Sequence, residues 1–485
     1  MVVNSLNFLL FFTVVFIVYY LPICRENAKI RNWWLFLTSY FFYGVADWKM
    51  IPVLFGATVI FYGLGLLLKS QMVKGNTRGA SFLTTLGVAL GVGMLLYFKY
   101  LNFFAESFTS LLSAIGFNVT WTTLNIVLPI GVSFFTFKLI SYVIDIHREH
   151  IEPCKDFIQF GTYIAFFPTL LSGPIDRPNK LIPQLEGAKQ FNYPLAIDGF
   201  RQILWGMFTK ICIADNLAIA TDQVWLSFTE QSGSTLLWIA LLYFIQMYTD
   251  FDGYSNMAIG VGKILGINIT RNFNHPLLAR NTAEYWRRWH MSLTTWITDY
   301  IFMPLNIRFR NWGNYGICLA CIINLVVIGF WHGANWSYGL FGLYHGLLFI
   351  PLVFSGAFGK NKKLKPSSIG LPKFSDFLKM VDTFTLVAVG LIIFRAASVS
   401  DAFGYLGGII STSLFSMPTR LVGRSTLLFI LALMVLEWLQ RDKEHPLQLA
   451  PEKAKWLPVV LDYLIIILII VFGNFEGNQF IYFQF

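Results

Sequence analysis

Charged residues are scarce in this sequence. Only 13% of its 485 residues are Asp, Glu, Lys or Arg, and 56% are hydrophobic, whereas an average soluble domain carries roughly 25% charged residues. The apolar residues also fall in runs close to the roughly 20 residues that a helix needs to cross a bilayer. This composition excludes an ordinary soluble protein and predicts an integral membrane protein with many spanning helices.

Cysteine is also scarce. The five cysteines are odd in number and lie mostly inside apolar runs, so the sequence contains no recognisable disulfide framework. Cys318 and Cys321 form a CxxC pair, but no second thiol pair or nearby histidine completes a metal site. We therefore predict that they pack within a helix and that the protein has no metal site.

Several common functional motifs are missing. The sequence has no GxSxG elbow, P-loop or dinucleotide-binding fingerprint. The net charge of +10 comes from Lys and Arg in short loops between apolar runs, which is typical of membrane topology and argues against a nucleic-acid partner. The basic clusters at 25–31 and 69–78 are predicted to be cytoplasmic, which places the N-terminus outside.

The apolar runs set the expected architecture. The first run has no basic leader and no small-residue cleavage site, so we interpret it as a spanning helix and not as a signal peptide. Several runs contain Gly or Pro, and broken backbone at membrane depth is tolerated only where protein buries it or where it lines a wet cavity. The predicted spans are 6–21, 33–46, 50–68, 82–98, 126–144, 157–172, 202–220, 235–249, 253–267, 316–331, 338–355, 382–397, 425–439 and 457–473.

These runs predict an all-α integral membrane protein, with a multi-pass helical fold, some short or re-entrant helices and a central tunnel. No internal repeat or separate soluble domain is visible, so a single transmembrane domain is expected over residues 1–485. Residues 356–376 are rich in Lys, Pro, Ser and Gly and are interpreted as a solvated connector. The polar stretches 173–201 and 271–315 are the places where chemistry is expected.

His332 is the sharpest candidate for chemistry, because an ionisable group at membrane depth is a functional candidate by default. It follows the predicted span 316–331, and Gly333 leaves space beside it. If the stretch is helical, Asn335 and Trp336 share its face, and Asn335 could fix the tautomer of the ring. A neutral imidazole can take a proton from an alcohol during attack on an acyl group. The alternative is a packed histidine that hydrogen-bonds a neighbouring helix.

His290 lies among aromatic and basic residues in the stretch Glu284–Leu293. At helical spacing Trp286, His290 and Thr294 share one face, whereas Arg287 and Arg288 point elsewhere and could meet phosphates or lipid headgroups. An interfacial belt of aromatic and basic residues explains the pattern equally well. Asp250 and Asp252 could be ion-pathway carboxylates, but we interpret them as interfacial residues beside Gly253. We interpret His345 as structural too.

At these two histidines the sequence resembles a known family, the membrane-bound O-acyltransferases, and in particular its bacterial branch of alginate O-acetyltransferases. The resemblance covers almost the whole chain, because the matching stretches follow one another in order. They are Leu128–Phe137 with Asp145 and Arg148, Phe166–Pro168, Ser172–Ile175, Asp252–Ser255 with Met257–Gly260, Trp286–Leu293, Trp331–Gly333, Phe394–Ala396 and Phe480–Phe485.

The resemblance implies that His332 is the catalytic base inside the tunnel and that His290 is the second functional histidine. Trp331 and Asn335 are then expected to orient His332, while Arg287 and Arg288 attract the phosphates of the donor. The remaining predicted tunnel residues are Trp286, Trp289 and Trp336.

The resemblance also implies the substrates and the location. The donor is expected to be a cytoplasmic acyl thioester, acetyl-CoA in the first place, with no permanently bound cofactor. The acceptor is expected to be an extracytoplasmic polysaccharide such as alginate, or a secreted SGNH-type acyltransferase that relays the group. The expected location is the bacterial inner membrane, which the protein crosses several times and where it contacts membrane lipid.

Two other functions stay open at this point. Within the family, the alternative is D-alanyl transfer to teichoic acid from a carrier-protein thioester. In another class, a transporter or flippase would use the interrupted helices as a permeation route, although it gives no reason for two histidines framed by Trp and Arg. A membrane scaffold is a third and weaker possibility.

Overall fold

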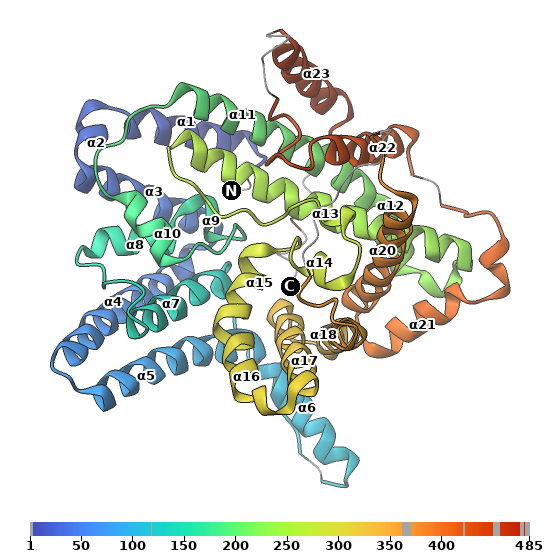
Figure 1. Ribbon diagram of the computed structural model, residues 1–485, viewed down its shortest axis with the longest axis horizontal. Helices are drawn as coiled ribbons and strands as arrows, with labels where there is room; N and C mark the ends of the chain where they lie inside the picture. Colours follow the sequence, from blue (N-terminus) through green and yellow to red (C-terminus); the bar gives the residue numbers. More distant parts are fainter. Residues whose placement is uncertain are drawn as a thin grey trace. The chain divides into compact units, whose positions relative to one another are not determined.

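The computed structural model describes residues 3–117, 119–360, 370–420, 422–449, 456–475 and Phe480, and every regular element within them is a helix. The chain forms two compact units, which are residues 1–200 with 258–270 and residues 201–257 with 271–485. Figure 1 labels the helices of both units. The single domain over residues 1–485 stays a prediction.

The first unit begins with long apolar helices and continues with shorter ones. Its second long helix starts at a polar cap, because the side chain of Asn27 accepts hydrogen bonds from the backbone N–H groups of Lys29 and Ile30. The helices are α1 (Leu6–Tyr19), α2 (Pro22–Glu26), α3 (Ala28–Asp47), α4 (Ile51–Val73), α5 (Thr77–Leu95), α6 (Leu101–Ala114), α7 (Val132–His147), α8 (Phe157–Ala165), α9 (Phe167–Leu170) and α10 (Pro178–Leu181).

The second unit carries the polar stretch 271–315 and the helices that follow it. Two of the three boundaries between the units lie inside helices, namely α11 (Tyr193–Met207) and α13 (Gly233–Ile264). The other helices are α12 (Asp215–Leu226), α14 (Thr282–Trp286), α15 (Met291–Ile297), α16 (Met303–Arg308), α17 (Gly313–His332), α18 (Trp336–Leu347), α19 (Ile350–Phe354), α20 (Phe374–Arg395), α21 (Val399–Ile409), α22 (Arg424–Leu439) and α23 (Leu457–Phe472).

Membrane-spanning capacity is spread over both units. Within the described ranges, six helical segments are long and apolar enough to cross a membrane, and two shorter apolar helices lie at 6–19 and 457–472. The six segments are Ala28–Val73, Thr77–Ala114, Tyr193–Leu226, Arg310–His332, Trp336–Phe354 and Phe374–Arg395. The protein is therefore an all-α, multi-pass membrane protein, as predicted.

One prediction was wrong in the middle of the chain. The runs 235–249 and 253–267 were expected to be separate spans with Asp250 and Asp252 at the interface, but α13 continues from Gly233 to Ile264. Both aspartates are buried. Lys210 forms ion pairs with Asp250 and Asp215. The negative charge of Asp250 is therefore neutralised inside the protein, and α13 does not have to end at the membrane surface.

The predicted span 126–144 also starts too early. α7 begins at Val132, after Gly131 with a φ of 74°, a left-handed conformation that glycine adopts without strain. The predicted span 157–172 is split into α8 and α9, since Phe166 is not helical and Pro168 lies in the first turn of α9. The connector predicted at 356–376 is shorter, because α20 begins at Phe374, and its residues 361–369 lie outside the described residues.

A close pair of helices, α17 and α18, supports the site (Figure 1). Glycines permit the approach: a methyl group on Gly342 would lie 2.6 Å from Cα of Val326, and one on Gly346 would lie 2.8 Å from Cα of Ile322. Small residues at such interfaces let two helix backbones come together in a membrane. The glycine spacing on α18 was visible in the sequence but was not used in the prediction.

Candidate functional site

His332 lies at the point where α17 ends. It is the last residue of the helix, and Gly333 continues with an extended backbone at a φ of −170°. The side chain of His332 is buried, and its ring meets those of Trp331 at 5.0 Å and Phe394 at 5.1 Å between centroids. The space expected beside Gly333 is filled, since a methyl group there would lie 2.7 Å from Cδ2 of Tyr338.

The prediction that Asn335 and Trp336 share a helix face with His332 was wrong. Asn335 is the N-cap of α18, where its Oδ1 accepts from the backbone N–H of Ser337 at 3.0 Å. Its Nδ2 donates to the carbonyl of Ala397 at 2.7 Å. These bonds hold the start of α18, so the expected orientation of the imidazole through a shared helix face does not apply. Trp336 is 54% exposed.

His290 occupies a left-handed turn between α14 and α15, with φ 44° and ψ 51°. It is therefore not on a continuous helix with Trp286 and Thr294, and that prediction was wrong. Asn272 holds the turn: its carbonyl accepts from the N–H of Met291 at 2.7 Å, and its Oδ1 accepts from the hydroxyl of Ser292 at 2.6 Å. Left-handed backbone in a non-glycine residue is uncommon, and such strain often marks a functional position.

Trp331 connects the two candidate histidines. The rings of Trp331 and His290 lie 5.6 Å apart, and those of Trp331 and His332 lie 5.0 Å apart, both nearly perpendicular. The ring of Phe251 contacts the imidazole of His290 at 4.6 Å. The structure thus brings His290, Trp331 and His332 together from two segments that are far apart in the sequence.

Burial determines the charge state of His290. Desolvation lowers its pKa to about 3, so the imidazole is neutral at physiological pH. A neutral ring has one donor and one acceptor nitrogen and can shape or polarise a substrate without adding a charge. This property agrees with the supporting role that was predicted for His290.

Trp286 and Trp289 lie in the same buried aromatic layer. The indole N–H of Trp286 donates to Nδ1 of His345 at 3.4 Å, and the ring of Trp289 stacks on that of Tyr285 at 5.4 Å. Phe341 contacts both His345, at 4.7 Å, and Phe394, at 5.2 Å. Because Phe394 also contacts His332, the rings of Phe341 on α18 and Phe394 on α20 connect His345 with His332.

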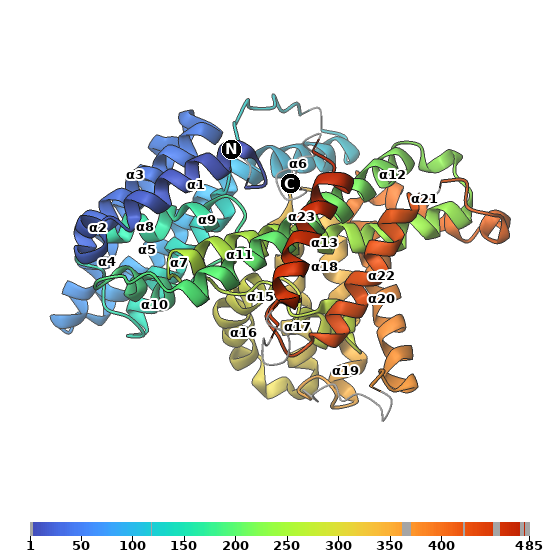
Figure 2. The ribbon, with the colours of Figure 1, turned by 90° about the horizontal axis from the view of Figure 1, so that it is seen from above.

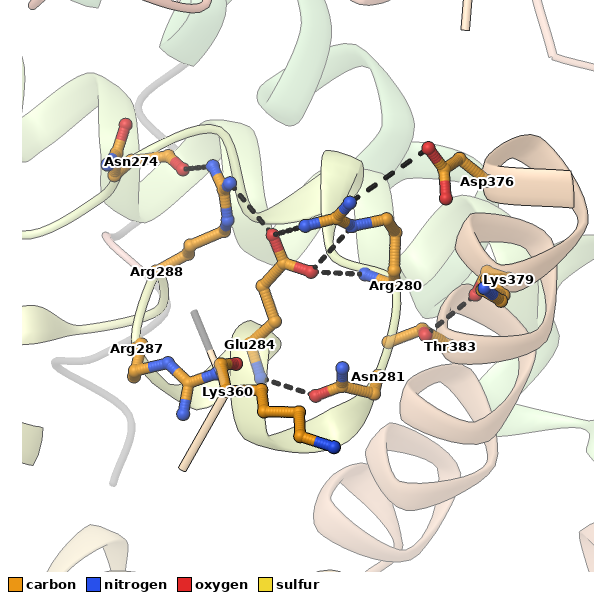
Figure 3. A network of polar contacts seen from close by, with 10 residues as sticks. All are labelled: Asn274, Arg280, Asn281, Glu284, Arg287, Arg288, Lys360, Asp376, Lys379 and Thr383. Carbon is orange, nitrogen blue, oxygen red and sulfur yellow. Dashed lines mark hydrogen bonds and ion pairs between the residues drawn. The ribbon is translucent and has the colours of Figure 1, made fainter. Parts of the chain in front are cut away.

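The two predicted phosphate-binding arginines differ in their partners, as Figure 3 shows. Arg288 forms an ion pair with Glu284 at 2.9 Å and donates to the carbonyl of Asn274 at 2.9 Å. Arg287 instead donates to the backbone carbonyls of Phe358, at 3.1 Å, and Lys360, at 3.3 Å. The charge of Arg288 is therefore compensated within the protein, whereas Arg287 is bound by neutral oxygens.

Glu284 is the centre of this network. It also forms an ion pair with Arg280 at 3.0 Å, and Arg280 lies 3.9 Å from Asp376 at the start of α20 (Figure 3). Burial alone would raise the pKa of Glu284, but the hydrogen bonds from Arg280 and the charge of Arg288 lower it below its usual value. The network ties the segment that precedes His290 to α20.

Comparison with known proteins places this site in a family. The model of the family MBOAT, membrane-bound O-acyltransferase, matches residues 149–361, which include both candidate histidines. A probable alginate O-acetylase of Pseudomonas aeruginosa is 34% identical over 467 residues, which cover 94% of this chain and 84% of the relative. This chain belongs to the membrane-bound O-acyltransferase family.

Other relatives of this O-acyltransferase carry different printed activities. A peptidoglycan O-acetyltransferase of Helicobacter pylori is 30% identical over 447 residues, 83% of this chain and 80% of the relative. A teichoic acid D-alanyltransferase of Bacillus subtilis is 30% identical over 279 residues, 56% of this chain and 69% of the relative. The prediction of the family and of a multi-pass membrane O-acyltransferase is confirmed; the roles of the individual site residues and the tunnel stay predictions.

Proposed function

We propose that this O-acyltransferase moves acetyl groups from cytoplasmic acetyl-CoA to hydroxyl groups of an extracytoplasmic polysaccharide. The relatives that match 83% to 94% of this chain are named for O-acetylation of alginate and of peptidoglycan. The observation that carries the site is the contact that the rings of His290 and His332 both make with the ring of Trp331. The location that follows is the bacterial inner membrane, which separates such a donor from such an acceptor.

His332 is the proposed general base. Its imidazole takes the proton of the acceptor hydroxyl while the oxygen attacks the carbonyl carbon of the thioester. The carbon–sulfur bond then breaks, and the thiolate of CoA leaves and takes up a proton. His290, neutral in its buried turn, is proposed to hydrogen-bond the reacting groups, and Trp331 fixes the position of both rings.

Arg287 is the proposed contact for the phosphates of the donor. Its guanidinium is bound by carbonyl oxygens of Phe358 and Lys360, which do not cancel its positive charge. Lys360 takes part in the network of Figure 3 through this backbone carbonyl, and its side chain is exposed. Arg288 is less suited to this role, because Glu284 already compensates it.

D-alanyl transfer from a carrier-protein thioester is the second candidate function. It is favoured by the likeness to teichoic acid D-alanyltransferases, which covers 56% of this chain. The likeness to the alginate and peptidoglycan relatives covers 83% to 94% of it. The greater coverage favours acetyl transfer. A secreted acyltransferase that relays the acetyl group is compatible with the same chemistry at His332.

The proposal is tested in inside-out membrane vesicles from cells that produce the protein and its native acceptor. Labelled acetyl-CoA or a labelled D-alanyl carrier protein is supplied at the cytoplasmic face, and label in the enclosed glycan is measured. We expect label from acetyl-CoA, a lower rate of labelling with His290→Ala, and a higher half-saturating donor concentration with Arg287→Gln. Label from the D-alanyl carrier alone would replace the proposal by the second candidate function.

A further inference from the structure

The stretch Phe394–Ala396 resembles the family but has no role in the mechanism proposed above. It lies where α20 ends and the chain leads into α21, and both helices can be followed in Figure 2. The ring of Phe394 meets the imidazole of His332 nearly perpendicularly, with 5.1 Å between the centroids. It also contacts two rings of α18, those of Tyr338 at 5.0 Å and Phe341 at 5.2 Å. Phe394 therefore packs between His332 and α18.

The backbone after α20 is bound to the short segment that follows His332. Nδ2 of Asn335, the N-cap of α18, donates a hydrogen bond to the carbonyl of Ala397 at 2.7 Å. Because α17 ends at His332 and α18 begins at Trp336, this bond joins the end of α20 to the connection between those two helices. A shift of the end of α20 would therefore move both Phe394 and this connection relative to His332.

An ion pair connects the same end of α20 to another helix, α12. Nη2 of Arg395 donates to Oδ1 of Asp222 at 2.8 Å. The guanidinium also lies over the ring of Tyr243 on α13, 5.9 Å from its centroid. Within the described part of the chain, Asp222 is the one carboxylate that pairs with Arg395. Without it, the charge of the guanidinium would be uncompensated one residue away from Phe394.

This ion pair lies near the ends of two segments that can cross a membrane. Arg395 is the last residue of the segment Phe374–Arg395, and Asp222 lies shortly before the end of the segment Tyr193–Leu226. The two side chains are 24% and 50% exposed. Ion pairs that are open to water contribute little to the free energy of unfolding. The loss of this pair should therefore affect the position of the end of α20 more than the stability of the protein.

We propose that Asp222 and Arg395 are positioning residues for His332. Their ion pair holds the end of α20, Phe394 at that end contacts the imidazole, and the imidazole keeps the orientation in which it takes the proton of the acceptor hydroxyl. This inference rests on the proposed function, because the pair acts through His332. Misplacement of a catalytic group by about 1 Å can lower a rate roughly 10²-fold, so a small movement of Phe394 is enough for a measurable effect.

The test measures CoA release from acetyl-CoA in inside-out vesicles, per mole of folded protein. We expect Asp222→Asn to lower kcat roughly ten- to hundredfold, with the half-saturating concentration of acetyl-CoA unchanged and only a small shift of the unfolding temperature. Asp222→Glu keeps the carboxylate and should restore most of the rate. Arg395→Gln should lower kcat by a similar factor, and the double variant should show no further fall, because both substitutions remove the same contact.

Another ion pair of the second unit, between Arg201 and Asp462, is the matched control. It joins α11 to α23, with 3.1 Å between the paired atoms and side chains that are 17% and 19% exposed. Arg201 donates to both oxygens of the carboxylate. This pair is more buried than that of Asp222, and neither of its residues takes part in the contacts around His332 described above. Asp462→Asn should therefore lower the unfolding temperature and leave kcat unchanged.

Two results would overturn the inference: an unchanged kcat with Asp222→Asn, or an equal fall of kcat with Asp462→Asn. His332→Ala in the same assay separates this inference from the proposed function. If His332→Ala keeps the full rate, the proposed base is wrong. If it loses the rate while Asp222→Asn keeps it, only the positioning role is wrong. Gel filtration identifies variants that fail to fold, and Arg395→Gln carries the test if Asp222→Asn is one of them.

Discussion

At the scale of single residues, the site depends on neutral rings and on a compensated ionic network beside them. Burial keeps His290 neutral, since its pKa is lowered to about 3. The ionic groups lie two to ten residues before His290 in the sequence, where Glu284 binds Arg280 and Arg288. Charge is thus held close to the histidines but apart from them.

Glu284 gives a prediction on the dependence of stability on pH. Because its pKa in the folded protein is lowered below the usual value of roughly 4.3, its pairs stabilise the protein above that pH and are lost as the pH falls through the folded-state pKa. Glu284→Gln should therefore lower the thermal unfolding temperature at pH 7 and have a smaller effect as the pH falls below about 4.3. Thermal unfolding of wild type and of Glu284→Gln across this pH range tests the prediction. A difference in unfolding temperature that grows on acidification would contradict it.

Asn272 gives a second prediction at this scale, on the position of His290. Asn272→Ala removes the acceptor of the Ser292 hydroxyl, which should loosen the left-handed turn at a cost of roughly 1–3 kcal/mol. We expect kcat for acetyl transfer to fall while KM for the donor changes little. In a His290→Ala background the same substitution should have no further effect on kcat. Thr295→Ala, on the same helix α15, is the control, because its hydroxyl bonds only carbonyls of its own helix.

At the scale of helices, the sequence correctly predicted the positions of most helices that depend on local hydropathy alone. Most apolar runs became helices, and the stretch 316–331 lies within α17. The failures occur where backbone dihedrals or distant partners decide. The helix break after His332 and the left-handed turn at His290 are set by tertiary packing. The continuity of α13 through Asp250 depends on Lys210, forty residues away in the sequence.

The site itself was predictable in part. The positions of the two histidines in the sequence were recognised through their motifs, but spacing alone assumed a helix through both of them. Trp331 was expected to orient His332; its contact with His290 comes from a long-range approach that no local pattern contains. Arg287 and Arg288 look alike in sequence, and only the contacts of Glu284 distinguish them.

The helix pair α17 and α18 gives the prediction at this scale. Gly342→Ala should push the helices apart, because the new methyl group would lie 2.6 Å from Cα of Val326. His332 ends α17, so the substitution is expected to lower both the unfolding temperature and the rate of acetyl transfer. Gly63→Ala on α4 is the matched control, since a methyl group there meets nothing within 4 Å. Equal unfolding temperatures and equal rates of acetyl transfer for the two variants would contradict this role of the contact between α17 and α18.

At the scale of the whole molecule, a chain with 13% charged residues concentrates its candidate chemistry in one of two compact units. His290, Trp331 and His332 all belong to the second unit. The family match of residues 149–361 includes the three residues but ends before α20 and α22. The central claim is therefore that His332 performs the acyl transfer as the base.

The most direct test of this claim is the rate of CoA release from acetyl-CoA in inside-out vesicles, measured per mole of folded protein. A general base contributes roughly 10²–10⁴-fold, so His332→Ala should lower the rate by about that factor. His150→Ala, which removes an imidazole that is 59% exposed, should leave it unchanged. An undiminished rate with His332→Ala would contradict the account.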